Sequence, residues 1–254
     1  MTFTDTHCHI HEESYADSEA AYDRAMDAGV ARLFCVGTDV KTSQEAVLFA
    51  RTHDNVWAII GIHPHEAKHD AERVADLRAL LEEEGNRAKI IGIGEIGLDY
   101  YYTHSPREVQ LEVLEAQIAL AQEFDVPISF HVREAFDDFW PVFDSFEGLR
   151  GVLHSFTDNQ TNLEQALARG LYIGVNGIVT FAKDKIDVFR AIPLDKLLLE
   201  TDAPFLTPVP KRGTVNEPAF VTYVANFISD LHSVSLKELS AATERNATTL
   251  FLNK

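Results

Sequence analysis

The chain has 254 residues, of which 46% are hydrophobic and 24% are charged, so it can bury one large core. It contains no run of about 18 apolar residues and begins without the basic and then apolar pattern of a secretory signal, so we expect no membrane segment and a cytoplasmic protein. The formal net charge of −18 argues against a protein that coats duplex nucleic acid. It does not exclude nucleic acid chemistry, because bound divalent cations attract phosphate locally.

Eight short apolar or β-branched runs predict strands, and helical segments lie between them. In chain order the predicted strands cover residues 3–8, 32–36, 56–60, 90–93, 127–131, 151–153, 172–175 and 197–199. Strands that alternate with helices favour right-handed parallel βαβ units, and eight such units close a barrel. We therefore predict an α/β protein with the (β/α)8 TIM barrel fold and a single domain over residues 1–254.

Local signals place some helix starts and one loop. Ser105 and Glu108 have capping-box spacing with Pro106 at the first helical position, and Ser235 opens another helix near the end of the chain. Residues 203–218 contain four prolines and predict a stiffened loop over the barrel mouth. The two cysteines, Cys8 and Cys35, lie in apolar runs and favour buried thiols over a disulfide.

Polar residues with metal-binding side chains fall at the ends of the predicted strands. In Asp5-Thr6-His7-Cys8-His9 the two histidines are two residues apart, so they share one side of a strand and can reach one ion. Barrel geometry brings the carboxyl ends of all strands to one rim. The candidate ligands at these ends are His7, His9, Glu95, His131, His154 and Asp202. Taken singly, each has a structural alternative, such as a helix cap or a satisfied core histidine. Six ligands together exceed one tetrahedral zinc site and indicate two metal ions.

Several blocks of sequence resemble the TatD family of metal-dependent hydrolases, in the amidohydrolase superfamily. They are residues 5–9, 61–65, 94–100, 131–133, 154–156, 200–204, 212–213 and 216–218. The resemblance spans nearly the whole chain. It implies a (β/α)8 barrel, a binuclear divalent metal centre, and deoxyribonuclease or related phosphodiesterase activity, often exonucleolytic in the 3′–5′ direction.

Residue by residue, the resemblance assigns each ligand to a metal. One metal would take His7, His9, Glu95 and Asp202, and the other would take Glu95, His131 and His154, so that Glu95 is the bridge. Asp158 and Asn176 depart from the glycine and serine that are common in the family. They put in doubt the substrate preference that the resemblance implies, but not metal binding. The native metal stays open between Zn²⁺, Mn²⁺ and Mg²⁺.

The expected mechanism is metal-assisted hydrolysis, with Asp202 and Glu95 as catalytic residues and Asp202 as general base. Arg133 and Arg212 are candidate phosphate clamps, with surface salt bridges as an equal alternative. His65 is a candidate contact to the scissile phosphate or the leaving oxygen, and one of His63 and His65 is expected to be structural. Asn216 and Glu217 are expected to hold Arg212 or to anchor the proline-rich loop, rather than to take part in catalysis. The three tyrosines at 100–102 either stack on bases or pack over the rim, and packing is expected for at least two of them.

Three functions remain open at this point. The first is a phosphodiesterase that acts on DNA ends or single-stranded DNA as a monomer without a membrane partner. The second is an amidohydrolase-type enzyme that opens a C–N or lactone bond of a small molecule. The third is a non-catalytic barrel that serves as a binding module, which would not need six intact ligands.

Overall fold

The computed structural model describes residues 1–13, 15–102 and 104–253 of the chain. The chain divides into two compact units. The terminal unit comprises Met1–Cys35 and Ser155–Lys254, and the middle unit comprises Val36–His154. Among the described residues, no helix combines the length and the apolar character that crossing a lipid bilayer requires.

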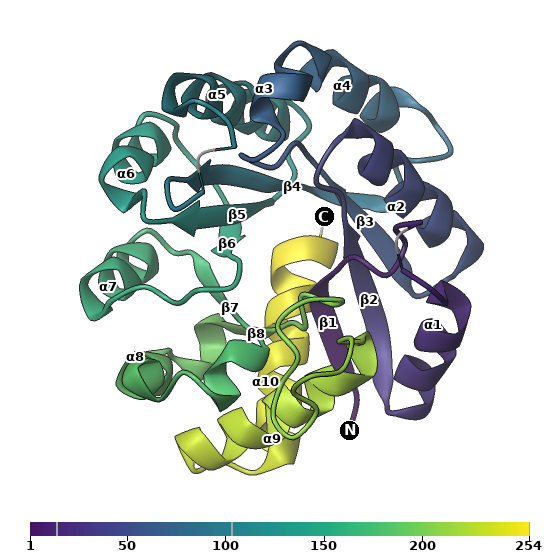
Figure 1. Cartoon of the computed structure of the whole chain (residues 1–254), viewed down its shortest axis with the longest axis vertical. Helices are drawn as coiled ribbons and strands as arrows, with labels where there is room; N and C mark the ends of the chain where they lie inside the picture. Colours follow the sequence, from purple (N-terminus) through teal and green to yellow (C-terminus); the bar gives the residue numbers. More distant parts are fainter. Residues whose placement is uncertain (14, 103, 254) are drawn as a thin grey trace. The chain divides into compact units, whose positions relative to one another are not determined.

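The terminal unit contains the first two and the last two strands of the chain, together with the helix between the first two strands and the helices of residues 155–254 (Figure 1). Its elements are β1 (Phe3–Cys8), α1 (Ser18–Asp27), β2 (Val30–Val36, whose last residue belongs to the middle unit), α7 (Gln160–Ala168), β7 (Tyr172–Val175), α8 (Ile186–Ala191), β8 (Leu197–Leu199), α9 (Val221–His232) and α10 (Leu236–Ala247). Short 3-10 turns cover Gly177–Thr180, Lys183–Lys185, Leu194–Lys196 and Pro218–Phe220, and a π-helical turn covers Thr248–Leu252. Helix α10 packs on β1, β8 and α9.

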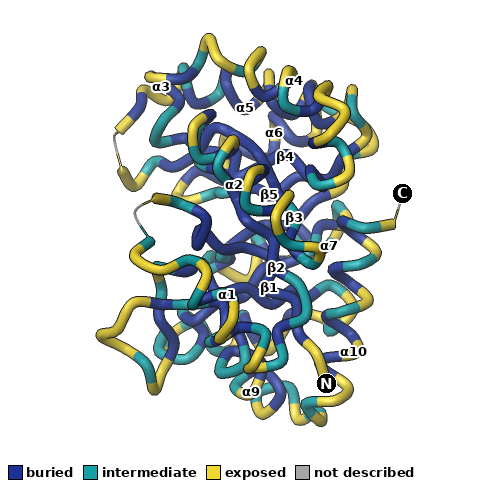
Figure 2. Tube along the Cα trace, turned by 90° about the vertical axis from the view of Figure 1, so that its right-hand side faces the viewer, coloured by how far each residue is buried: buried dark blue, intermediate teal, exposed yellow. Residues whose placement is uncertain are grey.

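The middle unit contains the other four strands and the helices between them. Its elements are α2 (Val40–Thr52), β3 (Val56–Ile60), α3 (Ala67–Asp70), a 3-10 turn (Ala71–Arg73), α4 (Val74–Glu82), β4 (Ile90–Asp99), α5 (Arg107–Glu123), β5 (Ile128–Arg133), α6 (Phe136–Asp144) and β6 (Gly151–Leu153). All ten residues of β4 are buried. Figure 2 shows β4 in the colour of buried residues, as expected for a parallel strand that helices cover.

The strand order confirms the predicted fold class. The strands follow in the order β1 to β8, each pair described within a unit is parallel, and helices alternate with the strands. This is the (β/α)8 barrel class. Five predicted strands have the observed bounds, namely β1, β3, β6, β7 and β8. One domain over residues 1–254 stays a prediction.

Two local predictions need correction. Strand β4 does not end at Ile93 but continues to Asp99, so Glu95 lies within the strand. Helix α5 begins at Arg107 without a side-chain cap. The Ser105 hydroxyl instead donates to the His65 carbonyl at 2.8 Å and accepts the Lys68 N–H at 3.1 Å. Tertiary partners therefore outcompete the predicted capping box.

The other two local predictions are confirmed. Ser235 caps α10 in a capping box with Glu238, which satisfies backbone donors at the helix start. Residues 203–217 form turns and irregular backbone without a helix. Prolines in this stretch remove backbone donors that a helix would need.

Candidate metal centre

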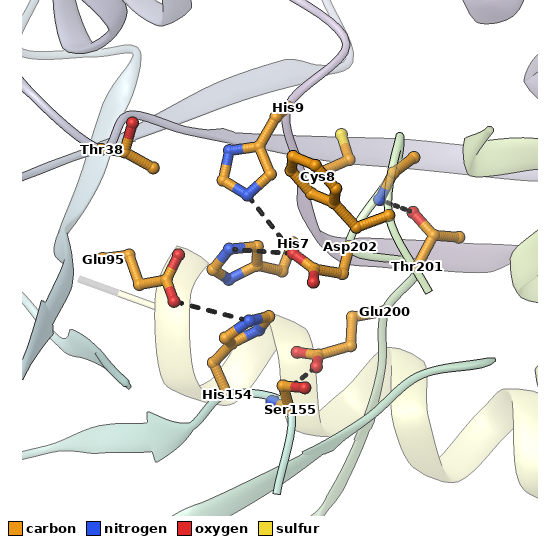
Figure 3. Close-up of polar contacts among 12 residues, drawn as sticks. His7, Cys8, His9, Thr38, Glu95, His154, Ser155, Glu200, Thr201 and Asp202 are labelled. Carbon is orange, nitrogen blue, oxygen red and sulfur yellow. Dashed lines mark hydrogen bonds and ion pairs between the residues drawn. The ribbon is translucent and has the colours of Figure 1, made fainter. Parts of the chain in front are cut away.

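The terminal unit brings His7, His9 and Asp202 together (Figure 3). The Nε2 atom of His9 lies 3.3 Å from Oδ1 of Asp202, and Nε2 of His7 lies 3.9 Å from the same oxygen. All three side chains are at most 13% exposed. The two histidines therefore face one carboxylate.

The backbone around Asp202 is held in an unusual conformation by β1. Asp202 has φ +59°, which is uncommon outside glycine but is tolerated by aspartate. Its N–H donates to the His7 carbonyl at 2.9 Å, and the His9 N–H donates to the Ala203 carbonyl at 2.7 Å. These bonds fix the relative positions of the two histidines and Asp202.

Buried Asp5 holds the residue before Asp202. Its carboxyl group accepts the Thr201 N–H at 2.9 Å and contacts the Thr201 hydroxyl at 2.5 Å. Burial raises the pKa of Asp5 to about 8, although the hydrogen bonds from Thr201 oppose that rise. Asp5 therefore ties the middle of β1 to the end of β8.

Asn216 anchors the proline-rich loop, as predicted. Its side-chain amide donates to the carbonyls of Thr201 at 2.8 Å and Phe205 at 2.5 Å. Glu217 pairs instead with Arg24 of α1, at 2.5 Å between Oε2 and Nε. Asn216 therefore joins the end of the loop to its beginning, and Glu217 joins the loop to α1.

In the middle unit three imidazoles surround one carboxylate oxygen. Oε1 of Glu95 lies 2.7 Å from Nδ1 of His131, 3.6 Å from Nε2 of His63 and 3.6 Å from Nε2 of His154. Figure 3 shows the Glu95 and His154 pair. One ligand atom from each of His63, Glu95 and His131 lies within 4.8 Å of the other two, which is the spacing of a metal-binding group.

A strand irregularity positions Glu95. Between Ile93 and Ile96 strand β4 advances three residues while its partner β5 advances two, from Ile128 to Phe130. The extra residue is the mark of a β-bulge, which redirects a side chain. The Glu95 N–H then donates to the Gly37 carbonyl at 3.1 Å.

Asp99, at the end of β4, orients two histidines. Its Oδ2 atom lies 3.0 Å from Nε2 of His131 and 3.0 Å from Nε2 of His65. The side chain of Asp99 is 1% exposed. A carboxylate on the second ring nitrogen of a ligand histidine fixes its tautomer and orientation.

The two central histidines of this unit have opposite pKa shifts. Burial lowers the pKa of His63, as does neighbouring His131. Burial also lowers the pKa of His131, but hydrogen bonds to Asp99 and Glu95 outweigh it and raise the value to about 9. Burial would raise the pKa of Asp99, but hydrogen bonds from His131, His65 and the Tyr102 N–H hold it well below its usual range. The low pKa keeps Asp99 anionic, so this carboxylate attracts positive charge to the group.

The guanidinium groups of both arginine candidates lie over aromatic rings. Arg133 places its guanidinium 3.9 Å from the Tyr101 ring centroid, and Arg212 lies 4.2 Å from the Phe181 ring centroid. Arg212 also donates to the Thr207 carbonyl at 3.1 Å. Both arginines are exposed.

Two residues of the middle unit gain importance from the structure. His63 is absent from the six predicted ligands, yet its Nε2 atom faces Glu95. Asp99 appeared only as part of the block at residues 94–100, yet it contacts two histidines. A carboxylate at the end of a barrel strand is a candidate site residue, and Asp99 ends β4. The predicted strand ended at residue 93, so the sequence did not indicate this role.

Comparison with known proteins identifies the family. The family model of TatD-related DNases matches residues 4–252. The chain belongs to this family. An uncharacterized metal-dependent hydrolase, YabD of Bacillus subtilis, is 39% identical over 97% of this chain and 98% of its own length. The 3′-5′ ssDNA/RNA exonuclease TatD of Erwinia amylovora is 37% identical over 92% of this chain and 93% of its own length.

A solved structure agrees with the fold of this TatD-family chain. The TatD homologue YJJV of Escherichia coli K12 superposes with a TM-score of 0.92, at 29% identity over 99% of this chain and 98% of that chain. The protein is accordingly a metal-dependent hydrolase, and its His, Glu and Asp groups are able to hold metal ions. Imidazole nitrogen suits Zn²⁺, and carboxylate oxygen suits Mn²⁺ and Mg²⁺.

Proposed function

We propose that this TatD-family protein is a 3′–5′ exonuclease that hydrolyses phosphodiester bonds at the ends of single-stranded nucleic acid. Family membership supports the reaction class, and the relative from Erwinia amylovora carries that activity in its name. The observation that carries the proposal is the convergence of three imidazoles on Oε1 of Glu95. A buried carboxylate among imidazoles is the donor set of a hydrolytic metal site.

We further propose that two divalent cations are held by the six predicted ligands, with Glu95 shared between them. Each unit supplies a group of the right chemistry, and the (β/α)8 fold places strand ends at one rim. The ligands are His7, His9, Glu95, His131, His154 and Asp202. When bound, such cations polarise a phosphoryl oxygen and make water acidic enough to ionise near neutral pH.

The chain's own residues would then carry the proton and orient the substrate. Asp202 is the proposed general base, because its carboxylate is held at β8 yet is 13% exposed and can meet water. His65 is partly exposed and oriented by Asp99, so it can contact a phosphate or protonate the leaving oxygen. Exposed Arg133 and Arg212 supply guanidinium groups for phosphate oxygens.

We also propose that the protein is located in the cytoplasm. Cys8 and Cys35 are free and fully buried, which suits the reducing conditions of a cytoplasm. A monomer stays a prediction from the sequence.

The proposal is tested with purified, metal-loaded protein and oligonucleotides labelled at either end. We expect stepwise shortening from the 3′ end and loss of about 100-fold or more of the rate in Asp202→Asn, because the amide cannot accept the proton. The control is Asp195→Asn, which changes an exposed carboxylate of the same unit and should retain full activity.

A panel of lactones and N-acyl amino acids serves as the competing substrate class. Turnover of these compounds without phosphodiester cleavage would replace the nuclease proposal with the amidohydrolase-type alternative. An Asp202→Asn variant that keeps its rate would remove Asp202 from the mechanism.

A further inference from the structure

Three consecutive tyrosines follow Asp99, and their environments differ. Tyr100 is packed, because its hydroxyl donates to Asp138 at 2.7 Å and the Arg107 guanidinium covers its ring at 4.0 Å. Tyr101 and Tyr102 are instead 52% and 42% exposed. Two of the three rings are therefore presented to solvent beside the candidate metal ligands of the middle unit.

The exposed rings form an ordered group with Arg133, which we call the aromatic platform. The centroids of Tyr101 and Tyr102 lie 4.7 Å apart with an interplanar angle of 88°. The Arg133 guanidinium lies 3.9 Å from the Tyr101 centroid and 5.0 Å from that of Tyr102. Tyr102 also meets His65 edge to face at 5.4 Å.

The buried carboxylate of Asp99 fixes the aromatic platform. Its Oδ1 atom accepts the backbone N–H groups of Tyr101 and Tyr102, each at 3.0 Å. Its Oδ2 atom contacts His131 and His65. Asp99 also pairs with Arg133 in the register of β4 and β5. One buried group thus sets the position of the platform relative to a proposed metal ligand.

We propose that the aromatic platform binds an unpaired base of the nucleic acid substrate, next to the phosphate that is cleaved. This inference rests on the proposed nuclease function and adds a base-binding subsite to it. Every base has a π face, so stacking on tyrosine accepts all four bases, and Arg133 adds a cation for the base or its phosphate. A protein partner is a poorer fit for the platform than a base, because three side chains offer far less area than the roughly 800 Å² per partner of a stable protein interface.

The platform implies a preference for single strands. A base inside a duplex is stacked on both faces, and exposing one face requires unstacking. An unpaired terminal base has a free face that a tyrosine ring can cover.

The test compares a natural single-stranded oligonucleotide with the same oligonucleotide carrying abasic residues at its last three 3′ positions. Metal-loaded wild type should lose about 10- to 100-fold in kcat/KM on the abasic substrate, from 1–3 kcal/mol of stacking per base. The double variant Tyr101→Ala/Tyr102→Ala should lose the same factor on the natural substrate and change little on the abasic one. This is the pattern of a coupled pair in a double-mutant cycle.

Conservative variants separate stacking from folding. Tyr101→Phe/Tyr102→Phe keeps both rings and should restore the dependence on the terminal bases that the alanine variant loses. Tyr100→Phe removes only the hydrogen bond to Asp138 and should also leave the base dependence unchanged. An equal loss on natural and abasic substrates in the alanine variant, or no loss on either, would overturn the platform.

Binding measurements keep this inference separable from the nuclease proposal. Fluorescence anisotropy with the two labelled oligonucleotides reports affinity even if wild type cleaves neither of them, a result that would refute only the nuclease function. Tighter binding of the natural oligonucleotide that depends on Tyr101 and Tyr102 supports the platform, and equal affinities overturn it.

Discussion

At the scale of single residues, unusual backbone conformations position two of the proposed metal ligands, Asp202 and Glu95. Asp202 has a positive φ and Glu95 occupies a bulge in β4. Both features cost conformational energy, and such features gather at functional sites when the surroundings impose them. Hydrogen bonds from β1 hold the backbone of Asp202, and Gly37 accepts the N–H of Glu95.

Gly97 is the residue that allows β4 and β5 to approach each other beside this bulge. It has φ +152°, and a Cβ atom at this position would lie 1.8 Å from the His131 carbonyl oxygen. We expect Gly97→Ala to lower the free energy of unfolding by about 3 kcal/mol or more, because backbone must move. Activity should fall too, since His131 lies on the displaced strand. Urea unfolding and the exonuclease assay measure both effects.

Gly85→Ala is the matched control for this substitution. Its added Cβ would meet only ordinary contacts, the nearest at 3.5 Å from an Arg51 nitrogen. A stability change within about 0.5 kcal/mol is expected there. A tolerated Gly97→Ala would show that the strands can separate without loss.

At the scale of elements, neighbouring helices are joined by polar contacts as well as by apolar packing. His232, in the last turn of α9, contacts the carbonyl of Phe189 in α8 at 3.2 Å from its Nε2 atom. Burial lowers the pKa of His232, nearby Arg190 acts in the same direction, and the hydrogen bond opposes them. The folded protein therefore favours the neutral imidazole.

This shift predicts a pH-dependent stability difference between wild type and His232→Gln. The pKa of His232 is lower in the folded protein than in the unfolded chain, so protonation favours the unfolded chain. The contribution of the neutral imidazole to stability is therefore fully present above about pH 6.5 and declines as the pH falls below it. Glutamine can still donate to the Phe189 carbonyl but does not titrate. Urea midpoints measured from pH 8 to pH 5 should show wild type losing stability relative to the variant. A difference that stays constant with pH would contradict the shift.

At the scale of the whole molecule, the acidic charge of −18 sets what the proposed site must supply. An acidic protein repels a phosphate backbone at long range, so attraction must come from local positive charge. In the proposed site, bound cations and the exposed Arg133 and Arg212 would provide it. The proposed activity should therefore depend on metal in both binding and chemistry.

Metal binding should also raise the free energy of unfolding and the Tm of the protein. Free cation at about 100 times its Kd stabilises the folded state by about 2.7 kcal/mol, which corresponds to a rise in Tm of roughly 5–10 °C for a chain of this size. Thermal unfolding of chelated protein with added Zn²⁺, Mn²⁺ or Mg²⁺ measures the rise, and elemental analysis of untreated protein identifies the native ion. His9→Asn should reduce the shift. Identical Tm values with and without every cation would contradict a metal centre.

The sequence by itself determined the fold class and the strand-end positions of His7, His9, His154 and Asp202. Apolar periodicity and chain order are local properties, and barrel topology follows from them. The tertiary structure alone decided that β4 runs on through a bulge, that Ser105 serves His65 and Lys68 rather than a helix cap, and that Asp99 links His131 to two exposed tyrosines. These outcomes depend on contacts between residues far apart in the chain, where a hydrogen-bond partner from another element competes with the local one.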